Sequence, residues 1–438
     1  MKNILKFGVP ALAALTLAEP ALAQEAAPDA VSGGTAYIFN TLLFLIGGFL
    51  VMWMAAGFAM LEAGLVRAKN TSTQCLKNIG LYAIAGLMFW LMGYNIAYPG
   101  DFNGFIGGFS GIYSMQGVGE ADVDTGYSVA SDWFFQMVFC ATTASIVSGT
   151  LAERIKIVPF FIFVTVLTGI IYPVVVSWEW GGGYLDSVWG FSDFAGSTLV
   201  HSTGGWAALV GALILGPRLG RYVDGKIVVF PGTNIPLATL GTFILWLGWF
   251  GFNGASQLAM GTVGDVSDVS KIFVNTNMAA CGGVVIAIIL TQLRYKKADV
   301  TMAMNGALAG LVSITAEPLA PTVGQSILIG MIGGAIVVFT VPLLDKLKID
   351  DVVGAIPVHL FAGIWGTLIV AWSNADATFI GQLVGVLLTM VWVGVTSGIL
   401  WFVLKAVMGL RPSAEVEIAG LDLHETGVEA YPGLANQA

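Results

Sequence analysis

The sequence predicts an all-α membrane protein that crosses the bilayer many times, and three observations support that prediction. Hydrophobic residues make up 56% of the 438 residues and charged residues only 10%, whereas soluble domains carry about 25% charge. The mean hydropathy is +0.83. Glycine occurs 57 times, and small residues let membrane helices approach one another closely.

Eleven stretches are apolar and long enough for a transmembrane helix, which needs about 20 residues. They lie near residues 36–63, 73–98, 130–151, 157–178, 197–216, 233–255, 270–292, 301–317, 323–344, 353–372 and 378–409. Residues 1–23 have the basic start, short apolar run and Ala-Leu-Ala end of a cleaved signal peptide; an uncleaved extra span is the alternative. The membrane domain then covers residues 24–410, and residues 411–438 form a polar tail.

The distribution of Lys and Arg supports this count and predicts an orientation. Sixteen Lys and Arg follow residue 23, and fifteen of them fall on one side of the membrane when the spans alternate; only Lys271 falls on the other. Cytoplasmic loops carry the excess of positive charge in membrane proteins. We therefore expect the N-terminus outside, in the periplasm, and the C-terminus in the cytoplasm.

Two of the three histidines occupy the same sequence frame. The two frames are Asp193-x-x-Gly196-x-x-x-Val200-His201 and Asp351-x-x-Gly354-x-x-x-Val358-His359, each with a Gly four positions after the His (Gly205, Gly363). His201 lies in the fifth expected span and His359 in the tenth. The pattern therefore predicts two five-helix repeats, about 36–216 and 233–372. Because five is odd, the repeats are inverted, and helix eleven (378–409) braces them. Inverted repeats with a site at the midplane are a recurrent transporter plan.

His201 and His359 each lie about eight residues into their helix, or ~12 Å at 1.5 Å per residue, which is near the bilayer centre. An ionisable side chain there is costly and marks a candidate functional site. Burial should keep both rings neutral, and two neutral rings that share one N–H still offer a donor and an acceptor. That arrangement suits a small neutral polar molecule or a relayed proton. Two core histidines satisfied by their neighbours are the alternative.

Five further residues lie where the outer mouth is expected, and each has an ordinary alternative. Asp193 is either a helix N-cap or an anion that favours a cation at the mouth. Trp180, in the outer sequence WEWGGG, is either an interfacial tryptophan or a ring face for a cation. Phe139 and Phe252, near the outer ends of spans three and six, are otherwise core or lipid-facing aromatics. Ser256 either supplies a hydroxyl or ends a helix.

Other chemistry is not indicated. The three cysteines, Cys75, Cys140 and Cys281, have no CxxC spacing and no nearby His, which argues against disulfides and a metal site. No nucleophile–base pair or metal cluster stands out. We expect no enzymatic activity, catalytic residue, metal or cofactor, and no nucleic-acid partner. The net charge of −9 is confined to loops and tail and indicates no partner preference.

Several runs of this sequence resemble the signature motifs of the Amt/Mep/Rh ammonium transporters, and of the Amt branch in particular. They are DFAGSTLVHSTGGWAALVGALILGPR from Asp193, GTLAERIKI from Gly149, ILWLGWFGFNGAS from Ile244, IPVHLFAGIWG from Ile356 and GLRPSAEVEIAGLDLHETGVEAY from Gly409. The resemblance extends from about residue 36 to 431. It departs at Ser197, where many members have Gly, and at ETGVEAY, where many have a His-Gly-Glu run.

The resemblance implies a path for ammonium through each subunit of a homotrimer. By match to the family motifs, Trp180 and Ser256 bind ammonium at the outer vestibule. Phe139, in FQMVF, and Phe252, in GWFGFN, form a stacked gate beneath it. A bare cation in an apolar pore meets a heavy desolvation cost, which ammonium avoids by giving up its proton and passing as ammonia. Potassium has no proton to lose.

The resemblance also implies roles for deeper residues and for the tail. His201 and His359 are the twin histidines that line the pore, where they stabilise ammonia and would carry the proton separately. Asp193 is the acidic residue required for transport, through shaping the site. The tail responds to the trimeric PII signalling protein, whose loop plugs the pore from the cytoplasm. We thus expect ammonium uptake across the cell inner membrane.

Two rival functions remain open from the sequence. An ammonium sensor with little flux would signal through its cytoplasmic tail, although only about 28 residues follow residue 410. A broad channel for small solutes such as water or carbon dioxide is the second rival.

The expected topology is testable with reporters that are active only in the cytoplasm. A reporter fused after Arg411 should be active, because the tail follows the eleventh span, and the same reporter inserted at Gly117 should be silent. Reversed activities would remove the eleven-span arrangement and the inverted repeat with it.

Overall fold

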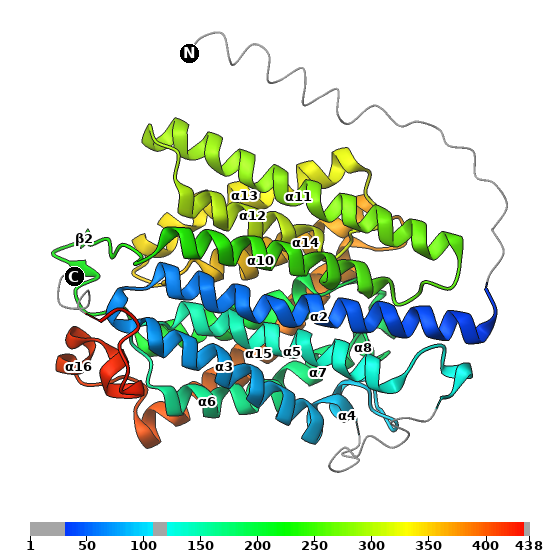
Figure 1. Cartoon of the computed structure of the whole chain (residues 1–438), viewed down its shortest axis with the longest axis horizontal. Helices are drawn as coiled ribbons and strands as arrows, with labels where there is room; N and C mark the ends of the chain where they lie inside the picture. Colours follow the sequence, from blue (N-terminus) through cyan, green and yellow to red (C-terminus); the bar gives the residue numbers. More distant parts are fainter. Residues whose placement is uncertain (1–30, 108–120, 433–438) are drawn as a thin grey trace, which may run out of the picture.

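The computed structural model describes residues 31–107 and 121–432, and most of them belong to helices that run side by side along one long axis (Figure 1). The expected signal peptide lies outside the described residues. We call the end of the bundle at which α16 and the β1–β2 hairpin lie the tail side. The opposite end, at which α8 lies, is the far side (Figure 1).

Helices lie at all eleven positions that the hydropathy predicts. They are α2 (Gly33–Leu65); α3 (Thr71–Met88) with η2 (Phe89–Gly93) and α4 (Tyr94–Ala97); α5 (Val129–Thr150); α6 (Ile157–Val166) with η4 (Leu167–Ile171) and α7 (Tyr172–Ser177); η5 (Ser197–Ser202) with α9 (Thr203–Leu215); α10 (Ile235–Gly254); α11 (Val263–Tyr295); α12 (Val300–Ile314); α13 (Val323–Lys346); η7 (Ile356–Phe361) with α14 (Ala362–Ser373); and α15 (Phe379–Met408). The short elements are η1 (Ala68–Asn70), η3 (Val123–Thr125), α8 (Tyr184–Trp189), β1 (Tyr222–Val223), β2 (Lys226–Ile227), η6 (Ala255–Gln257), α16 (Ala414–Ala419) and η8 (Asp422–Thr426).

Nine of the described helices are long and apolar enough to cross a membrane. The two expected spans outside that set are α5, which is long enough but less apolar, and α12, which has 15 residues. α5 is an interior helix: 18 of its 22 residues are buried, so it faces protein rather than lipid and tolerates many Ser and Thr. The membrane-spanning helical architecture is confirmed, and the count of eleven crossings stays a prediction.

Glycines allow the closest contacts between helices. In α13, a Cβ at Gly330 would lie 1.9 Å from the carbonyl oxygen of Ala279 in α11. A Cβ at Gly283 in α11 would lie 2.1 Å from the carbonyl oxygen of Gly306 in α12. Backbones this close leave no room for a side chain, which explains the high glycine content.

Buried ion pairs tie the helix ends together on the tail side. Glu153 follows α5 in a left-handed conformation, with φ of 67°. Its carboxylate pairs with the guanidinium groups of Arg67 and Arg218. Arg218 also makes a bidentate contact with Asp350, at 2.8 and 2.9 Å. Burial alone raises the pKa of Asp350, but the hydrogen bonds from Arg218 hold that pKa below its usual range.

The tail folds back onto the tail side instead of extending into solvent. The Asp422 carboxylate accepts hydrogen bonds from the backbone N–H groups of Ser72 and Thr73, both at 2.9 Å, in the first turn of α3. The Glu417 carboxylate accepts two hydrogen bonds from Arg411 and one from the backbone N–H of Leu219. The tail therefore caps a membrane helix.

The glycine contacts predict a local effect on stability. Gly330→Ala should lower the melting temperature of the detergent-purified protein by several degrees, because α11 and α13 must separate to admit the methyl group. Gly394→Ala is the matched control, since a Cβ at Gly394 in α15 meets nothing within 4 Å. Tryptophan fluorescence during heating measures both; equal melting temperatures would contradict the packing argument.

Candidate functional site

A column of aromatic rings runs through the interior and contains the two histidines. Trp180 lies edge-on to Phe139 with ring centroids 6.0 Å apart, and Phe139 lies 4.1 Å from Phe252. Phe252 stacks on His201 at 5.3 Å, and His201 on His359 at 5.1 Å. The structure thus brings together residues from five different segments of the chain.

The two imidazoles contact each other directly. Their Nδ1 atoms are 3.2 Å apart, so one Nδ1 carries a hydrogen and the other accepts it. In two neutral rings this leaves one Nε2 as an acceptor and the other as a donor. The Nε2 of His201 is buried and has no hydrogen-bond partner among the residues that the structure describes. The pair is therefore equipped to meet one small polar guest.

The repeated sequence frame explains why the histidines meet. Each His lies in a π-helical turn that follows a glycine with left-handed φ, 106° at Gly196 and 80° at Gly354. The glycine four positions after each His then packs against the other turn. A Cβ at Gly205 would lie 2.7 Å from the Cβ of Leu360, and one at Gly363 would lie 2.6 Å from the carbonyl oxygen of Ser197. The two helices cross where neither has a side chain.

Carboxylates hold the starts of both turns, and Asp351 is only half-buried. The fully buried Asp193 accepts hydrogen bonds from four backbone N–H groups, those of residues 196–199, at 2.7–3.1 Å. Asp351 accepts one from the N–H of Ile356 at 2.8 Å and one from the Thr150 hydroxyl at 3.1 Å. Burial raises the pKa of each carboxyl to about 6, against the opposing effect of these donors. The Asp193 carboxylate is thus directed at the first N–H groups of the helix.

A cavity of about 420 Å³ opens on the far side above this column. Trp180, Phe139 and Ser256, three of the residues named from the sequence, line it. The Trp180 indole N–H donates to the carbonyl oxygen of Asp193 at 3.0 Å, which fixes the ring, and the Ser256 hydroxyl donates to the carbonyl oxygen of Phe252 at 2.8 Å. We call this cavity the outer vestibule.

Sequence reasoning missed a carboxylate in the outer vestibule. Asp132, in the first turn of α5, lines the cavity with Gln136 and Phe139, four and seven positions later on the same helix face. The Tyr94 hydroxyl donates to its carboxylate at 2.5 Å. The i, i+4, i+7 spacing was visible in the sequence, but Asp132 stands at the edge of its span, where an acidic residue is common.

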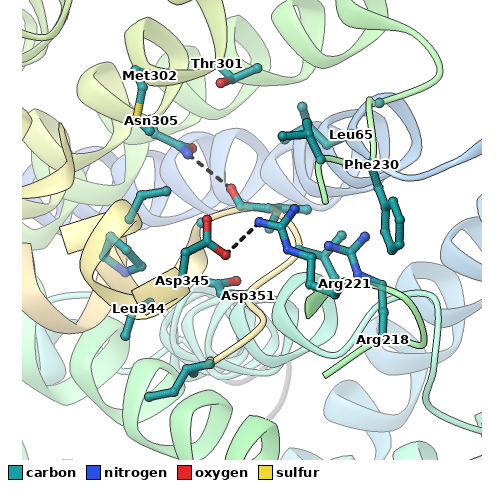
Figure 2. A pocket seen from close by; sticks show the side chains of 18 of the residues that line it. Leu65, Arg218, Arg221, Phe230, Thr301, Met302, Asn305, Leu344, Asp345 and Asp351 are labelled. Atoms are coloured by element: carbon teal, nitrogen blue, oxygen red, sulfur yellow. Dashed lines mark hydrogen bonds and ion pairs between the residues drawn. The ribbon is translucent and has the colours of Figure 1, made fainter. Parts of the chain in front are cut away.

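A second large cavity, of about 290 Å³, opens on the tail side and is lined by both charged and apolar residues (Figure 2). Arg221 pairs with Asp345 at 2.7 Å, and Asn305 donates to the carbonyl oxygen of Val353 at 3.1 Å. Asp351 also lines this cavity. Within the described residues, no group of three His, Cys, Asp or Glu could hold a metal ion.

Comparisons with known proteins agree on one family. Residues 42–431 match the Ammonium Transporter Family. The chain is 41% identical to the ammonium transporter Amt2 of Archaeoglobus fulgidus over 420 residues, which cover 89% of this chain and 87% of the relative. It is 37% identical to the ammonium transporter Amt1 of Haloferax mediterranei, covering 92% of this chain and 81% of the relative.

Two solved structures share the fold. A protein named Sensor Amt Protein superposes with a TM-score of 0.84 and 34% identity, over 90% of this chain and all of that chain. Mep2 of Candida albicans superposes with a TM-score of 0.78 and 24% identity, over 88% of this chain and 89% of that one.

The cap at Asp193 predicts a large effect of its removal. Asp193→Ala leaves four buried N–H groups without their acceptor and should cost on the order of 3 kcal/mol, seen as a lower melting temperature. Asp265→Ala is the matched control, because Asp265 belongs to the partly exposed capping box of α11, where water replaces the carboxylate. If both changes lower the melting temperature equally, the Asp193 carboxylate contributes no more to stability than the Asp265 carboxylate, which would contradict this prediction.

Proposed function

Because this chain belongs to the Ammonium Transporter Family, we propose that it takes up ammonium across the cell inner membrane through a pore in each subunit. The column from Trp180 to His359 carries the proposal, since two adjacent phenylalanine rings, tilted by 30°, lie between an outer vestibule and a pair of contacting histidines. Ammonium binds in the vestibule, loses its proton, and crosses as ammonia.

The outer vestibule supplies what a small cation needs. The ring of Trp180 offers a π face, Ser256 offers a hydroxyl oxygen, and the buried Asp132 adds negative charge. Phe139 and Phe252 beneath it are fully buried and provide no polar atom. A cation that keeps its charge meets the desolvation cost there, whereas ammonia does not. This difference excludes potassium.

The twin histidines receive the ammonia below the rings. One Nε2 accepts a hydrogen bond from an N–H of ammonia, and the other donates one to the ammonia lone pair. Either ring can therefore bind the neutral molecule. Asp193 acts by holding the turn that presents His201, not by touching ammonium. Its role is to position the histidine.

Assembly and orientation follow the family resemblance. We propose a homotrimer with the N-terminus in the periplasm and the tail in the cytoplasm, so that the tail side faces the cell interior. Residues 1–23 direct the chain to the membrane as a signal peptide. The folded tail, which contacts α3 through Asp422, offers a surface for the PII signalling protein.

An ammonium sensor is the second candidate function. The observation in its favour is the likeness to a protein named Sensor Amt Protein, at a TM-score of 0.84. A tail held against the ends of α3 and α6 would report the state of the bundle to a partner. The ammonium flux through the purified protein distinguishes the two functions, because a sensor needs little ammonium flux and a transporter needs a large one.

The twin histidines give the decisive test of transport. His201→Ala and His359→Ala should each change ammonium-dependent flux in proteoliposomes by at least tenfold, because each removes half of the polar site, while both still insert in the membrane. His424→Ala is the matched control, since His424 lies exposed in the tail. If both variants transport ammonium at the wild-type rate and with the wild-type selectivity, the histidines have only a structural role.

Regulation by PII depends on the tail. Removing all residues after Leu410 should weaken capture of PII trimers in pull-downs with ADP, and Asp422→Ala should do so in part by releasing the tail from α3. Glu415→Ala, at an exposed carboxylate of the same tail, is the control. Equal capture by full-length and truncated protein would show that the tail is not the receptor.

A further inference from the structure

We propose that the Glu62 carboxylate is the acid and base at the tail end of the pore, which takes up the proton released by ammonium and returns it to ammonia. The inference rests on the proposed transport function and adds a residue to it. Glu62 lies in the last turns of α2, in the sequence MLEAG, and is 1% exposed. A buried carboxylate is costly without a role.

Glu62 lies beside a small cavity that His359 also lines. His359 and Glu62 line the same cavity of about 10 Å³, which is roughly the space for one water molecule. Asn305 and Val353 line this cavity and also the large tail-side cavity. Glu62 is therefore placed along the path from His359 to the tail-side opening.

One carboxylate oxygen of Glu62 lacks a hydrogen-bond partner among the described residues. Its Oε2 accepts a hydrogen bond from the Ser148 hydroxyl at 2.8 Å. Its Oε1 is buried and has no hydrogen-bond partner within residues 31–107 and 121–432. An unsatisfied buried oxygen is expensive, and a proton, a water molecule or an ammonia molecule in the adjoining cavity would satisfy it.

A purely structural role for Glu62 fits the geometry less well. Its partner in charge is the buried Lys77, whose ammonium donates to the carbonyl oxygen of Ser148 at 2.8 Å and lies 4.9 Å from the centre of the Phe160 ring. Ser148 thus stands between the two charges and contacts both. Lys77 supplies a positive charge that favours the carboxylate form, yet its ammonium makes no hydrogen bond to Oε1.

The proton transfers balance without any further reactant. At the outer vestibule an N–H bond of ammonium breaks, its electron pair stays on nitrogen, and the proton passes through His201 and His359 to Oε1 of Glu62, where an O–H bond forms. When ammonia reaches the small cavity, that O–H bond breaks, its electron pair returns to the carboxylate, and a fourth N–H bond forms. One positive charge crosses for each ammonia.

The test separates charge movement from ammonia movement in proteoliposomes. Glu62→Gln keeps the shape and the hydrogen bond to Ser148 but cannot exchange the proton. We expect the ammonium-evoked current on a supported membrane to fall at least tenfold. Internal alkalinisation above that of protein-free vesicles reports ammonia that enters without its proton, and its rate should rise above that of wild type. Glu62→Asp should retain part of the current.

Two further variants exclude a structural explanation. Glu62→Gln with Lys77→Met removes both buried charges; if Glu62 only balances Lys77, this pair regains the current, and if Glu62 moves the proton, it does not. Glu317→Gln changes another buried carboxylate, which no pore cavity of the described structure contains, and should keep the wild-type current.

The outcomes distinguish this inference from the proposed function. Wild-type protein with neither current nor ammonia entry would overturn the transport proposal. Wild-type ammonia entry without current, a wild-type current in Glu62→Gln, or recovery of the current in the double variant would overturn the role of Glu62 and leave the pore intact.

Discussion

The hydrogen bonds that Asp193 and Asp351 accept from helix N–H groups are the interaction on which the arrangement of the two histidines depends. A helix that starts inside an apolar interior has unsatisfied N–H groups, and these two carboxylates satisfy them at the positions where the two histidine helices begin. With the starts held, Gly205 and Gly363 let the helices cross in backbone contact, and the imidazoles come within 3.2 Å of each other. Phe252 then stacks on His201, and Phe139 lies against Phe252.

The central pair was predictable because the same sequence frame occurs twice, with one histidine at the same position in each copy. Glu62 and Asp132 were not predicted as site residues for the opposite reason. Each stands near the end of an apolar segment, where charged residues ordinarily meet water, and only tertiary packing turns them inward. The lower hydropathy of α5 has the same cause, since a helix surrounded by protein need not be apolar.

The two ends of the bundle are built differently. The tail side is clamped by buried ion pairs among Arg67, Glu153, Arg218 and Asp350 and by the folded tail. The outer vestibule on the far side is lined by tyrosines, tryptophan and a single buried carboxylate, Asp132. A charge-paired base and a polar aromatic mouth suit the proposed pore, which would select its cargo at the mouth and be regulated at the base.

The shared hydrogen between the two imidazoles has a consequence for turnover. Because only one Nδ1 carries a hydrogen, the two rings are opposite tautomers at any moment, although both histidines lie in the same sequence frame. A proton that hops through the pair from Nε2 of one ring to Nε2 of the other leaves the tautomers exchanged. A second proton cannot pass in the same direction until both rings return to their first tautomers. In the proposed pore, the rate of that return would limit how fast charge can follow ammonia.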